Sequence, residues 1–494
     1  MGTQGAIFNL LLRDDRYDKY LTANDVLRDR LSRLKTPTYE DITKSHNLYL
    51  YSTYKPYVAI ASEYSKVKSS GGSMYLSNAK TSMVFHFNIF GHFTSDMAIQ
   101  VKFKPIGNPD SNDTDYPLLR YCAWPGIRLF EKVELKSDQV VVDDYVPDDV
   151  ILWMNHFVGK DKMTGWQRCH GQQETKEATY YNANGFTGVL HYRDGLQTPK
   201  RYHEEFDMFV PLHFEMCKDP ASAIPNHLTT NTQRTISVDL AKLSDIVQAL
   251  DDQGNVIPLP FERMAIELNL YINGLYVNPD IHCIFSEKVN FKLMRVHRRQ
   301  HTILHCPEEN IKMDKLKYPA EFLMSGFRST KNAEGFDTWC LMGGKRERTP
   351  EKKLLVPAMI WNTTDDVCEL VCRDASETTS LDPVVTDVGV LAHGTTIFEM
   401  NRLQFYNSYL PGRYNSCCGI MSPIDSSSFL IPFCLFPGDT KVSGYYNLST
   451  GRELFISYRG KDISSDNPVE LVVSMSALNF LLRKGDTMSL LISL

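Results

Sequence analysis

The fold class of this chain is decided by the stretch Ile266-Glu267-Leu268-Asn269-Leu270-Tyr271-Ile272-Asn273-Gly274-Leu275-Tyr276. It is rich in the aliphatic and aromatic residues that favour β-strands. Within it, Asn273-Gly274 predicts a tight turn or a β-bulge. Similar short runs, bounded by Gly, Pro, Asn or Asp, recur along the chain. They predict further strands at 82–89, 97–103, 132–135, 206–212, 288–296, 321–326, 353–360, 429–435, 453–458 and 470–475.

The organisation predicted from these runs is two antiparallel β-sandwiches in tandem. A chain of 494 residues is too long for one hydrophobic core, because cores stop growing near about 250–300 residues. Internal helices are expected to be few and short, with 240–250 as the best candidate. Strands do not alternate with helices, which argues against parallel α/β architectures. The boundary between the sandwiches is expected between Val277 and His305.

Residues 1–40 have a different pattern, which is helical. Apolar residues recur at helical spacing, with charged residues between them, and Pro37 is expected to end the helix. We therefore expect an N-terminal arm outside both sandwiches. Its acidic and basic residues nearly balance, which favours a protein partner over anionic lipid. The apolar positions are Tyr17, Tyr20, Leu21, Val26, Leu27, Leu31 and Leu34.

Composition indicates a folded protein, with 43% hydrophobic and 23% charged residues. The net charge is -6 and the basic residues are scattered among acidic ones, so no direct nucleic-acid binding is expected. No secretory signal is recognised, and the longest apolar stretches, 429–436 and 471–482, are shorter than the roughly 20 residues of a membrane span. The eleven cysteines are expected to be reduced thiols in a cytosolic compartment, and the sequons at Asn112, Asn362 and Asn447 to be unmodified.

Three clusters raise the question of metal binding. The spacing of His297, His301 and His305, followed by Cys306, places the histidines on one face of a helix or strand, but Arg298 and Arg299 oppose a cation, so a polar connector leaving a strand is favoured. The second cluster is two cysteine pairs, which lack the spacing of zinc knuckles: Cys368 with Cys372, and Cys417 with Cys418. The third cluster is acidic and lacks the pattern of a calcium loop, so we interpret it as a solvated loop; it contains Asp143, Asp144, Asp148 and Asp149.

Recognisable catalytic motifs are missing from the chain. It contains no phosphate-binding P-loop, no GxGxxG turn and no Gly-x-Ser-x-Gly elbow. A triad assembled from distant strands stays conceivable, because triads are defined by geometry. The prediction is nevertheless a protein that is not an enzyme, with no catalytic, cofactor-binding or metal-binding residues.

A series of segments carries a family resemblance, among them Tyr121-Cys122-Ala123-Trp124-Pro125-Gly126-Ile127-Arg128-Leu129-Phe130-Glu131. In their order along the chain they resemble the double jelly-roll major capsid proteins of nucleocytoplasmic large DNA viruses, such as that of African swine fever virus. No single segment is diagnostic, but together they extend over nearly the whole chain. The other segments are 23–27, 55–58, 63–67, 161–165, 197–200, 267–300, 392–394, 444–449, 452–453 and 471–482.

The resemblance implies an all-β fold of two tandem antiparallel jelly rolls, at 41–285 and 286–494, after the arm at 1–40. It implies a major capsid protein of a large double-stranded DNA virus, located in the virion and assembled in the host cytoplasm. Homotrimers would form pseudo-hexagonal capsomers that tile an icosahedral shell. Expected partners are further copies of the chain, minor capsid or penton proteins, and an inner viral membrane reached through the arm.

The chain departs from this family pattern by being shorter, notably between Glu174 and Gln197, which leaves the outer loops in doubt. One alternative is a poxvirus-type double jelly-roll scaffold on immature virion membranes. An alternative of another class is a carbohydrate-binding or cupin-like jelly roll. Cupins need convergent histidine and carboxylate ligands inside one barrel, whereas the His297 cluster lies near the expected boundary.

Overall fold

The structure is a computed structural model. It describes residues 59–491, apart from gaps at 70–73, 89–90, 110–115, 139, 174, 182–186, 194, 230–232, 344–354, 363–366, 375–382, 449–452, 462 and 485–486. The predicted arm at 1–40 lies outside the described residues. No described helix has the length and apolar character needed to cross a membrane.

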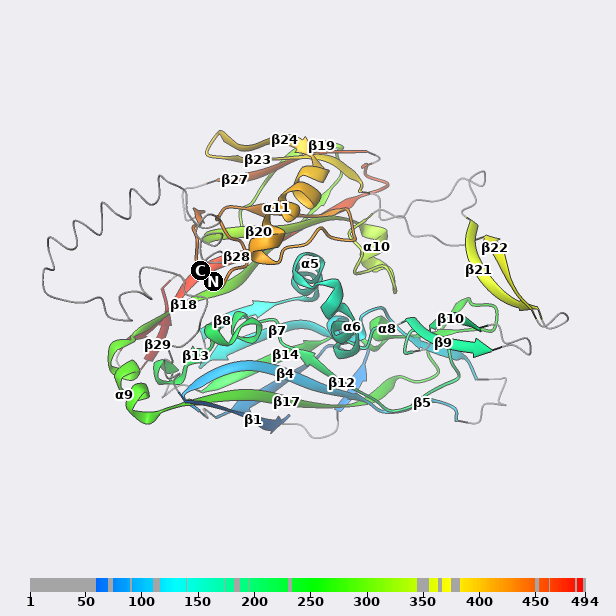
Figure 1. Ribbon diagram of the computed structural model, residues 1–494, viewed down its shortest axis with the longest axis horizontal. Coiled ribbons are helices and arrows are strands. Elements are labelled where there is room, and N and C mark those ends of the chain that lie inside the picture. Colours follow the sequence, from blue (N-terminus) through cyan, green and yellow to red (C-terminus); the bar gives the residue numbers. More distant parts are fainter. Residues whose placement is uncertain are drawn as a thin grey trace, which may run out of the picture. The chain divides into compact units, whose positions relative to one another are not determined.

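Eight strands in the first part of the chain form the main paths of two antiparallel sheets (Figure 1), one of which two short additional strands extend to six. Counted along the chain, the first, eighth, third and sixth strands make one sheet, β1-β17-β4-β12. The second, seventh, fourth and fifth make the other, β3-β14-β7-β8. This order is that of a jelly roll, which consists of eight strands in two Greek keys. The strands are β1 (Ile60–Lys68), β3 (Thr81–Phe87), β4 (Phe93–Phe103), β7 (Phe130–Ser137), β8 (Val140–Tyr145), β12 (Phe206–Pro211), β14 (Arg234–Leu240) and β17 (Arg263–Val277).

The second part of the chain repeats the same order. Its first, eighth, third and sixth strands form the sheet β18-β28-β20-β25, and the other four form β19-β27-β23-β24. The chain therefore contains two jelly rolls, which confirms the predicted fold class. The strands are β18 (Phe291–Leu304), β19 (Glu308–Lys312), β20 (Pro319–Ser329), β23 (Val385–Ala392), β24 (Thr395–Arg402), β25 (Ser428–Pro432), β27 (Leu454–Gly460) and β28 (Val469–Lys484).

Connections between these strands carry the remaining elements. In the first jelly roll these are β2 (Met74–Ser77), β5 (Ile106–Gly107), β6 (Leu118–Tyr121), α4 (Pro125–Arg128), α5 (Pro147–Phe157), α6 (Lys160–Cys169), β9 (Thr175–Tyr181), β10 (Thr187–Arg193), β11 (Tyr202–His203), α7 (Glu215–Lys218), η1 (Pro220–Ser222), β13 (Ile224–Pro225), η2 (Asn226–Thr229), α8 (Leu243–Ile246), β15 (Val247–Leu250) and β16 (Val256–Ile257). In the second they are α10 (Thr330–Glu334), β21 (Leu355–Asn362), β22 (Val367–Asp374), η3 (Phe405–Tyr409), α11 (Leu410–Cys418), β26 (Tyr446–Asn447) and β29 (Thr487–Leu490).

The two jelly rolls are joined by α9 (Pro279–Lys288). The boundary at 285/286 falls within this helix, since the last strand of the first set ends at Val277 and the first strand of the second begins at Phe291. Residues 59–494 nevertheless cluster as one compact unit. Helix α5 lies between the two sets of sheets in Figure 1, and it contacts β7 of the first and β20, β25 and β28 of the second.

Alternation of side chains produces the core of each jelly roll. In β14, every second residue is buried, including Ile236, Val238 and Leu240, because successive strand residues point to opposite faces. In the second jelly roll, Phe327 of β20 stacks on Phe429 of β25 with ring centroids 5.5 Å apart. Burial of such side chains contributes about 1.5–3 kcal/mol each.

Several predicted elements need correction. The helix predicted at 240–250 is wrong: α8 covers one turn, and Val247–Leu250 instead pairs with β6 as strand β15. The strand predicted to start at 288 begins at Phe291, after α9. The bulge at Asn273-Gly274 is confirmed, because the pairing of β17 with β4 shifts register between Ile272 and Gly274.

Gly107 offers a stability test, because it combines φ of +96° with close packing. A Cβ there would lie 2.1 Å from the carbonyl oxygen of Arg201, whereas at Gly254, with φ of +85°, a Cβ would meet nothing within 4 Å. Both Gly→Ala variants carry backbone strain of about 1 kcal/mol or more. We expect Gly107→Ala to lower the free energy of unfolding by at least about 1 kcal/mol more than Gly254→Ala in urea titrations. Equal losses would show that the backbone moves to relieve the clash.

Candidate functional site: a charge network between the jelly rolls

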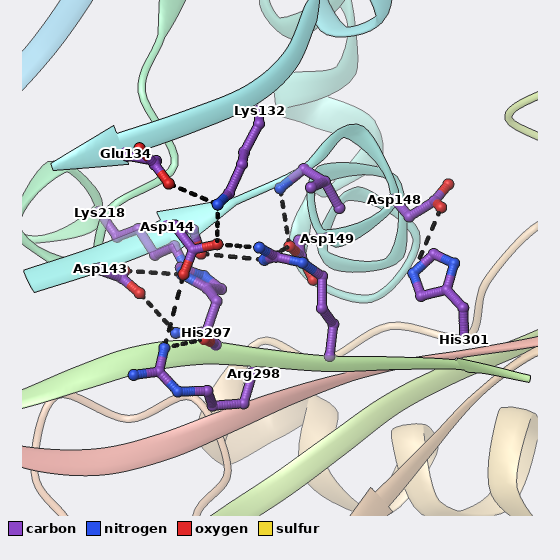
Figure 2. A network of polar contacts seen from close by, with 12 residues as sticks. Lys132, Glu134, Asp143, Asp144, Asp148, Asp149, Lys218, His297, Arg298 and His301 are labelled. Carbon is purple, nitrogen blue, oxygen red and sulfur yellow. Dashed lines mark hydrogen bonds and ion pairs between the residues drawn. The ribbon is translucent and has the colours of Figure 1, made fainter. Parts of the chain in front are cut away.

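A buried network of charged side chains connects the two jelly rolls (Figure 2). On one side, β8 and the first turn of α5 carry the four aspartates noted in the sequence. On the other side, β18 carries the His297 to His301 segment. About 150 residues separate these segments in the sequence, so the fold alone brings them together.

The start of α5 explains why the aspartates lie where they do. Val146 has an extended backbone and Pro147 occupies the first helical turn, where the missing N–H costs nothing. The Val146 N–H donates to the Asp149 carboxylate at 3.0 Å. Asp148 and Asp149 also lie at the helix end where the backbone dipole favours negative charge.

His297 is held by Asp143 through two hydrogen bonds. Its backbone N–H donates to Asp143 Oδ1 at 2.8 Å, and its Nδ1 donates to Oδ2 at 2.9 Å. Asp143 is 2% exposed and His297 6%. The other ring nitrogen, Nε2, lies 3.4 Å from the ammonium of Lys218, whose pKa is lowered by burial.

Arg299 binds the carboxylates of Asp144 and Asp149. It pairs with Asp144, donates to the Asp144 carbonyl at 3.2 Å, and lies 3.2 Å from Asp149 Oδ2. Asp149 is 1% exposed, so its charge would be costly without these partners. Arg298 stacks on Tyr318 with 4.5 Å between its guanidinium carbon and the ring centroid.

Arg328 of β20 anchors a second part of the network. It donates to both oxygens of Asp148, at 2.7 and 3.1 Å, and to Glu470 of β28 at 2.8 Å. His301 Nδ1 lies 2.9 Å from the other oxygen of Glu470. Burial alone would raise the pKa of Glu470, but the hydrogen bonds from His301 and Arg328 outweigh it and lower this pKa to about 2.

Arg295 forms a third pairing at the same interface. It contacts Glu321 of β20 at 2.5 Å and Glu215 of α7, in the first jelly roll, at 2.9 Å. It also donates to the backbone carbonyl of Thr440 at 3.4 Å. The guanidinium therefore joins three segments, since its planar fork has five donors.

Two interpretations of the sequence are wrong at this site. The aspartate cluster is not a solvated loop, because Asp143 and Asp149 are buried and α5 begins at Pro147. The His297 segment is not a polar connector, because it lies inside β18. His305 does follow the strand and is exposed.

The network contains functional residues that the sequence interpretation missed, chiefly Arg295, Glu321, Arg328 and Glu470. A usable signal was present for Glu321 and Arg328, which are the two charged residues of β20 and lie among mostly apolar neighbours. Charged residues are rarely fully buried unless paired. What the sequence does not supply is the pairing itself.

The charge pairs of this arrangement have a structural role, because they hold the two jelly rolls against each other. Its carboxylates are matched by arginine, lysine or histidine, which satisfies the requirement for burying charge. Among the residues that the structure describes, no group of three or more His, Cys, Asp or Glu could hold a metal ion. Cys418 is half-buried and forms no disulfide, while the side chains of Cys368, Cys372 and Cys417 lie outside the described residues.

We expect no stoichiometric zinc in the purified protein. Zinc requires three or four convergent ligands, whereas His297 Nδ1 and His301 Nδ1 already face carboxylates and lie beside arginines. Elemental analysis of the full chain checks this. One zinc per chain that disappears in His301→Ala, but persists in the exposed control His305→Ala, would contradict it.

Comparison with known proteins gives a coherent result, although no family model matches the chain. The major capsid protein of African swine fever virus (isolate Pig/Kenya/KEN-50/1950) is 24% identical, with 97% of this chain and 98% of that protein covered. The alignment extends over 636 residues, more than the 494 of the chain, so the relative has additional segments. The resemblance to this protein is confirmed.

Solved structures show the same fold. The Faustovirus major capsid protein superimposes with a TM-score of 0.75 at 24% identity, covering 95% of this chain and all of that one. The PBCV-1 virus capsid protein does so with a TM-score of 0.63 at 14% identity, covering 90% of this chain and all of that one. These similarities confirm the double jelly-roll architecture.

Proposed function

We propose that this chain, a relative of the major capsid proteins of large DNA viruses over nearly its full length, is the building block of an icosahedral virion shell. In this proposal, three copies form a pseudo-hexagonal capsomer, and capsomers tile the shell after assembly in the host cytoplasm. The observation that carries the proposal is the strand order, which occurs twice in one chain. Two similar sandwiches per chain give six in a closed trimer.

The charge network supports this role by joining the two jelly rolls into one unit. In a six-lobed capsomer, threefold symmetry fixes the positions of whole chains but not the positions of the two jelly rolls within each chain. Contacts within the chain must therefore hold the two jelly rolls in a fixed position relative to each other. The pairs Arg328–Asp148 and His297–Asp143 connect the two jelly rolls directly. Buried, oriented charges of this kind favour one packing over others, a specificity role that we assign to the network as part of the proposal.

Exposed apolar side chains support self-association. Exposed hydrophobic residues scattered singly are normal, whereas contiguous apolar patches mark surfaces that partners cover, and we propose that some of these residues form such patches. Several lie on sheet strands, including Tyr64 of β1, Phe209 of β12 and Met400 of β24. Others are Ile60, Tyr75, Ile303, Tyr409, Ile424, Leu435, Phe436 and Tyr445.

The remaining partners belong to the same proposal. Minor capsid or penton proteins would bind the capsomer, and residues 1–40 would attach it to a minor protein or the inner membrane. The named relatives are structural proteins of virus capsids, and we propose that this chain likewise has no enzymatic role.

Negative-stain electron microscopy of the purified full-length chain tests the proposal. Particles with a hexagonal outline, six lobes and threefold symmetry are expected. Ordered sheets of such particles on membranes, without closed shells, would instead favour the scaffold alternative. Single two-lobed particles at all concentrations would contradict a capsomer.

A further inference from the structure

A cavity of about 500 Å³ lies where the first jelly roll ends and the second begins. Its walls come from the end of β17, from α9, from the start of β18, and from α7 and η1. Arg295 and Glu215 of the charge network line one side of it, and the other side chains of the wall take no part in the network. A volume of this size lies within the range of about 300–1,000 Å³ typical of small-ligand sites.

Most of the cavity wall is apolar. It includes Phe93, Met216, Leu275, Val277 and Leu293. At the mouth, three further apolar side chains are unusually exposed: Ile60 at 65%, Phe285 at 43% and Phe291 at 57%. Exposed apolar residues around an apolar hollow favour an occupant with its own hydrocarbon surface.

Lys292 gives the cavity a single unmatched charge. The one described hydrogen bond of its ammonium is to the carbonyl oxygen of Ala221, at 3.4 Å, and none of the described carboxylates forms an ion pair with it. Burial lowers the pKa of Lys292, and the nearby carboxylates of Glu215 and Asp219 offset this only in part, because neither forms an ion pair with the ammonium.

The other charged groups on the wall are already paired. Arg295 binds Glu321 and Glu215, and Glu215 also lies 4.0 Å from Lys218. An anion entering the cavity would therefore find one unpaired cation, Lys292, at the edge of an apolar wall. Direct pairing with an anion would offset the cost of keeping that ammonium half-buried without an ion pair.

We propose that this cavity binds a single aliphatic chain with an anionic head group, either a carboxylate or a phosphate. The hydrocarbon lies against the apolar wall, and the head group accepts hydrogen bonds from the Lys292 ammonium. This site is independent of the proposed capsid function, since it lies within one chain. It adds a small-molecule ligand to a protein for which none is otherwise indicated.

Isothermal titration of the full-length protein with sodium decanoate, below its micelle concentration, tests the site. Saturable binding near one decanoate per chain is expected. Lys292→Met retains the aliphatic stem and removes the charge, so it should weaken decanoate binding at least about tenfold. The control Lys288→Met, which changes an exposed lysine on α9 outside the lining, should stay within about twofold. Decanol, which lacks the charge, should bind both variants alike.

A second variant tests occupancy of the hollow without changing its charge. Ala221 is exposed and lines the cavity, so Ala221→Trp should block decanoate while the protein stays folded. Decyl phosphate and phosphatidic acid vesicles distinguish the sources: binding of decanoate alone indicates a free fatty acid, and stronger binding of decyl phosphate or vesicles indicates a phosphate-headed lipid.

Three results would overturn the proposal. The first is the absence of saturable decanoate and decyl phosphate binding to the folded wild-type chain. The second is binding that both Lys292→Met and Ala221→Trp leave unchanged. The third is binding only by a chain lacking residues 1–38, which would identify the chain's own N-terminal segment as the occupant.

Discussion

Replacing Arg328 with Met is expected to lower the free energy of unfolding by about 3–5 kcal/mol. The guanidinium is 6% exposed and donates to Asp148, to Glu470 and to the carbonyl of Trp339. Methionine fills similar space but leaves two carboxylates buried without their shared partner. Urea unfolding of the full chain, followed by tryptophan fluorescence, measures the loss.

The matched control for this variant is Arg459→Met. Arg459 contacts Glu308 at 3.0 Å, but both side chains are 57% exposed. Solvent-exposed pairs contribute at most about 1 kcal/mol. Similar losses in the two variants would show that the network does not hold the jelly rolls together, and a loss below about 1 kcal/mol in Arg328→Met would show the same.

Acidification from pH 6.5 to 4 is expected to destabilise the protein through three buried histidines, His156, His170 and His213, whose pKa values burial lowers. Burial lowers the pKa of His156 and His170 to about 4, from an ordinary value of 6.5. Between these values the unfolded chain takes up protons that the folded chain does not, so stability falls as the pH falls. The expected loss is on the order of 3 kcal/mol per histidine by pH 4.

Other groups with shifted pKa values act beside these histidines, among them His301 and Glu470. His301 has a raised pKa, so it stabilises the fold below pH 6.5 and loses this contribution as the pH rises. Glu470 stabilises the fold above pH 4.5 and loses its contribution as the pH falls toward 2. Because three buried histidines with lowered pKa values oppose one histidine with a raised pKa, the net effect between pH 6.5 and 4 remains destabilising.

Urea midpoints measured across this range test the histidine assignment. His170→Gln should give a flatter dependence on pH than the wild type, since the buried titrating group is gone. The exposed control His86→Gln should leave the slope unchanged. A slope that His170→Gln and His156→Gln both preserve would show that other groups cause the acid sensitivity.

The strands were the most predictable part of the fold. The sequence predicts strands at 97–103 and 206–212, and β4 and β12 contain these residues almost entirely. Their strand propensity is local, so short windows of sequence carry it. The repeated strand order depends on contacts between distant segments. The family resemblance implies this order, whereas local residue patterns do not.

Helix α5 shows where local signals were present but misread. Pro147 followed by Asp148 and Asp149 is a typical helix start, yet we interpreted the aspartate cluster that contains them as a solvated loop. Conversely, 240–250 has helical spacing, and its second half is held as a strand by pairing with β6. Tertiary pairing overrides a short helical preference there, because isolated short helices are marginal.

The pairing of residues within the charge network could not be predicted from a single sequence. Arg299 and Asp149 are each ordinary surface residues when considered alone, and their partnership follows only from the packing of α5 against β18. Complementary charge between two distant segments is a usable hint, but many such pairs exist in a chain with 53 basic and 59 acidic residues.

The central claim, a homotrimeric capsid building block, is tested most directly by the mass of the native particle. Light scattering coupled to size-exclusion chromatography of the full chain should report three times the 56.5 kDa of one chain, independent of concentration over the micromolar range. A correctly folded particle with the mass of one chain at every concentration would contradict the claim.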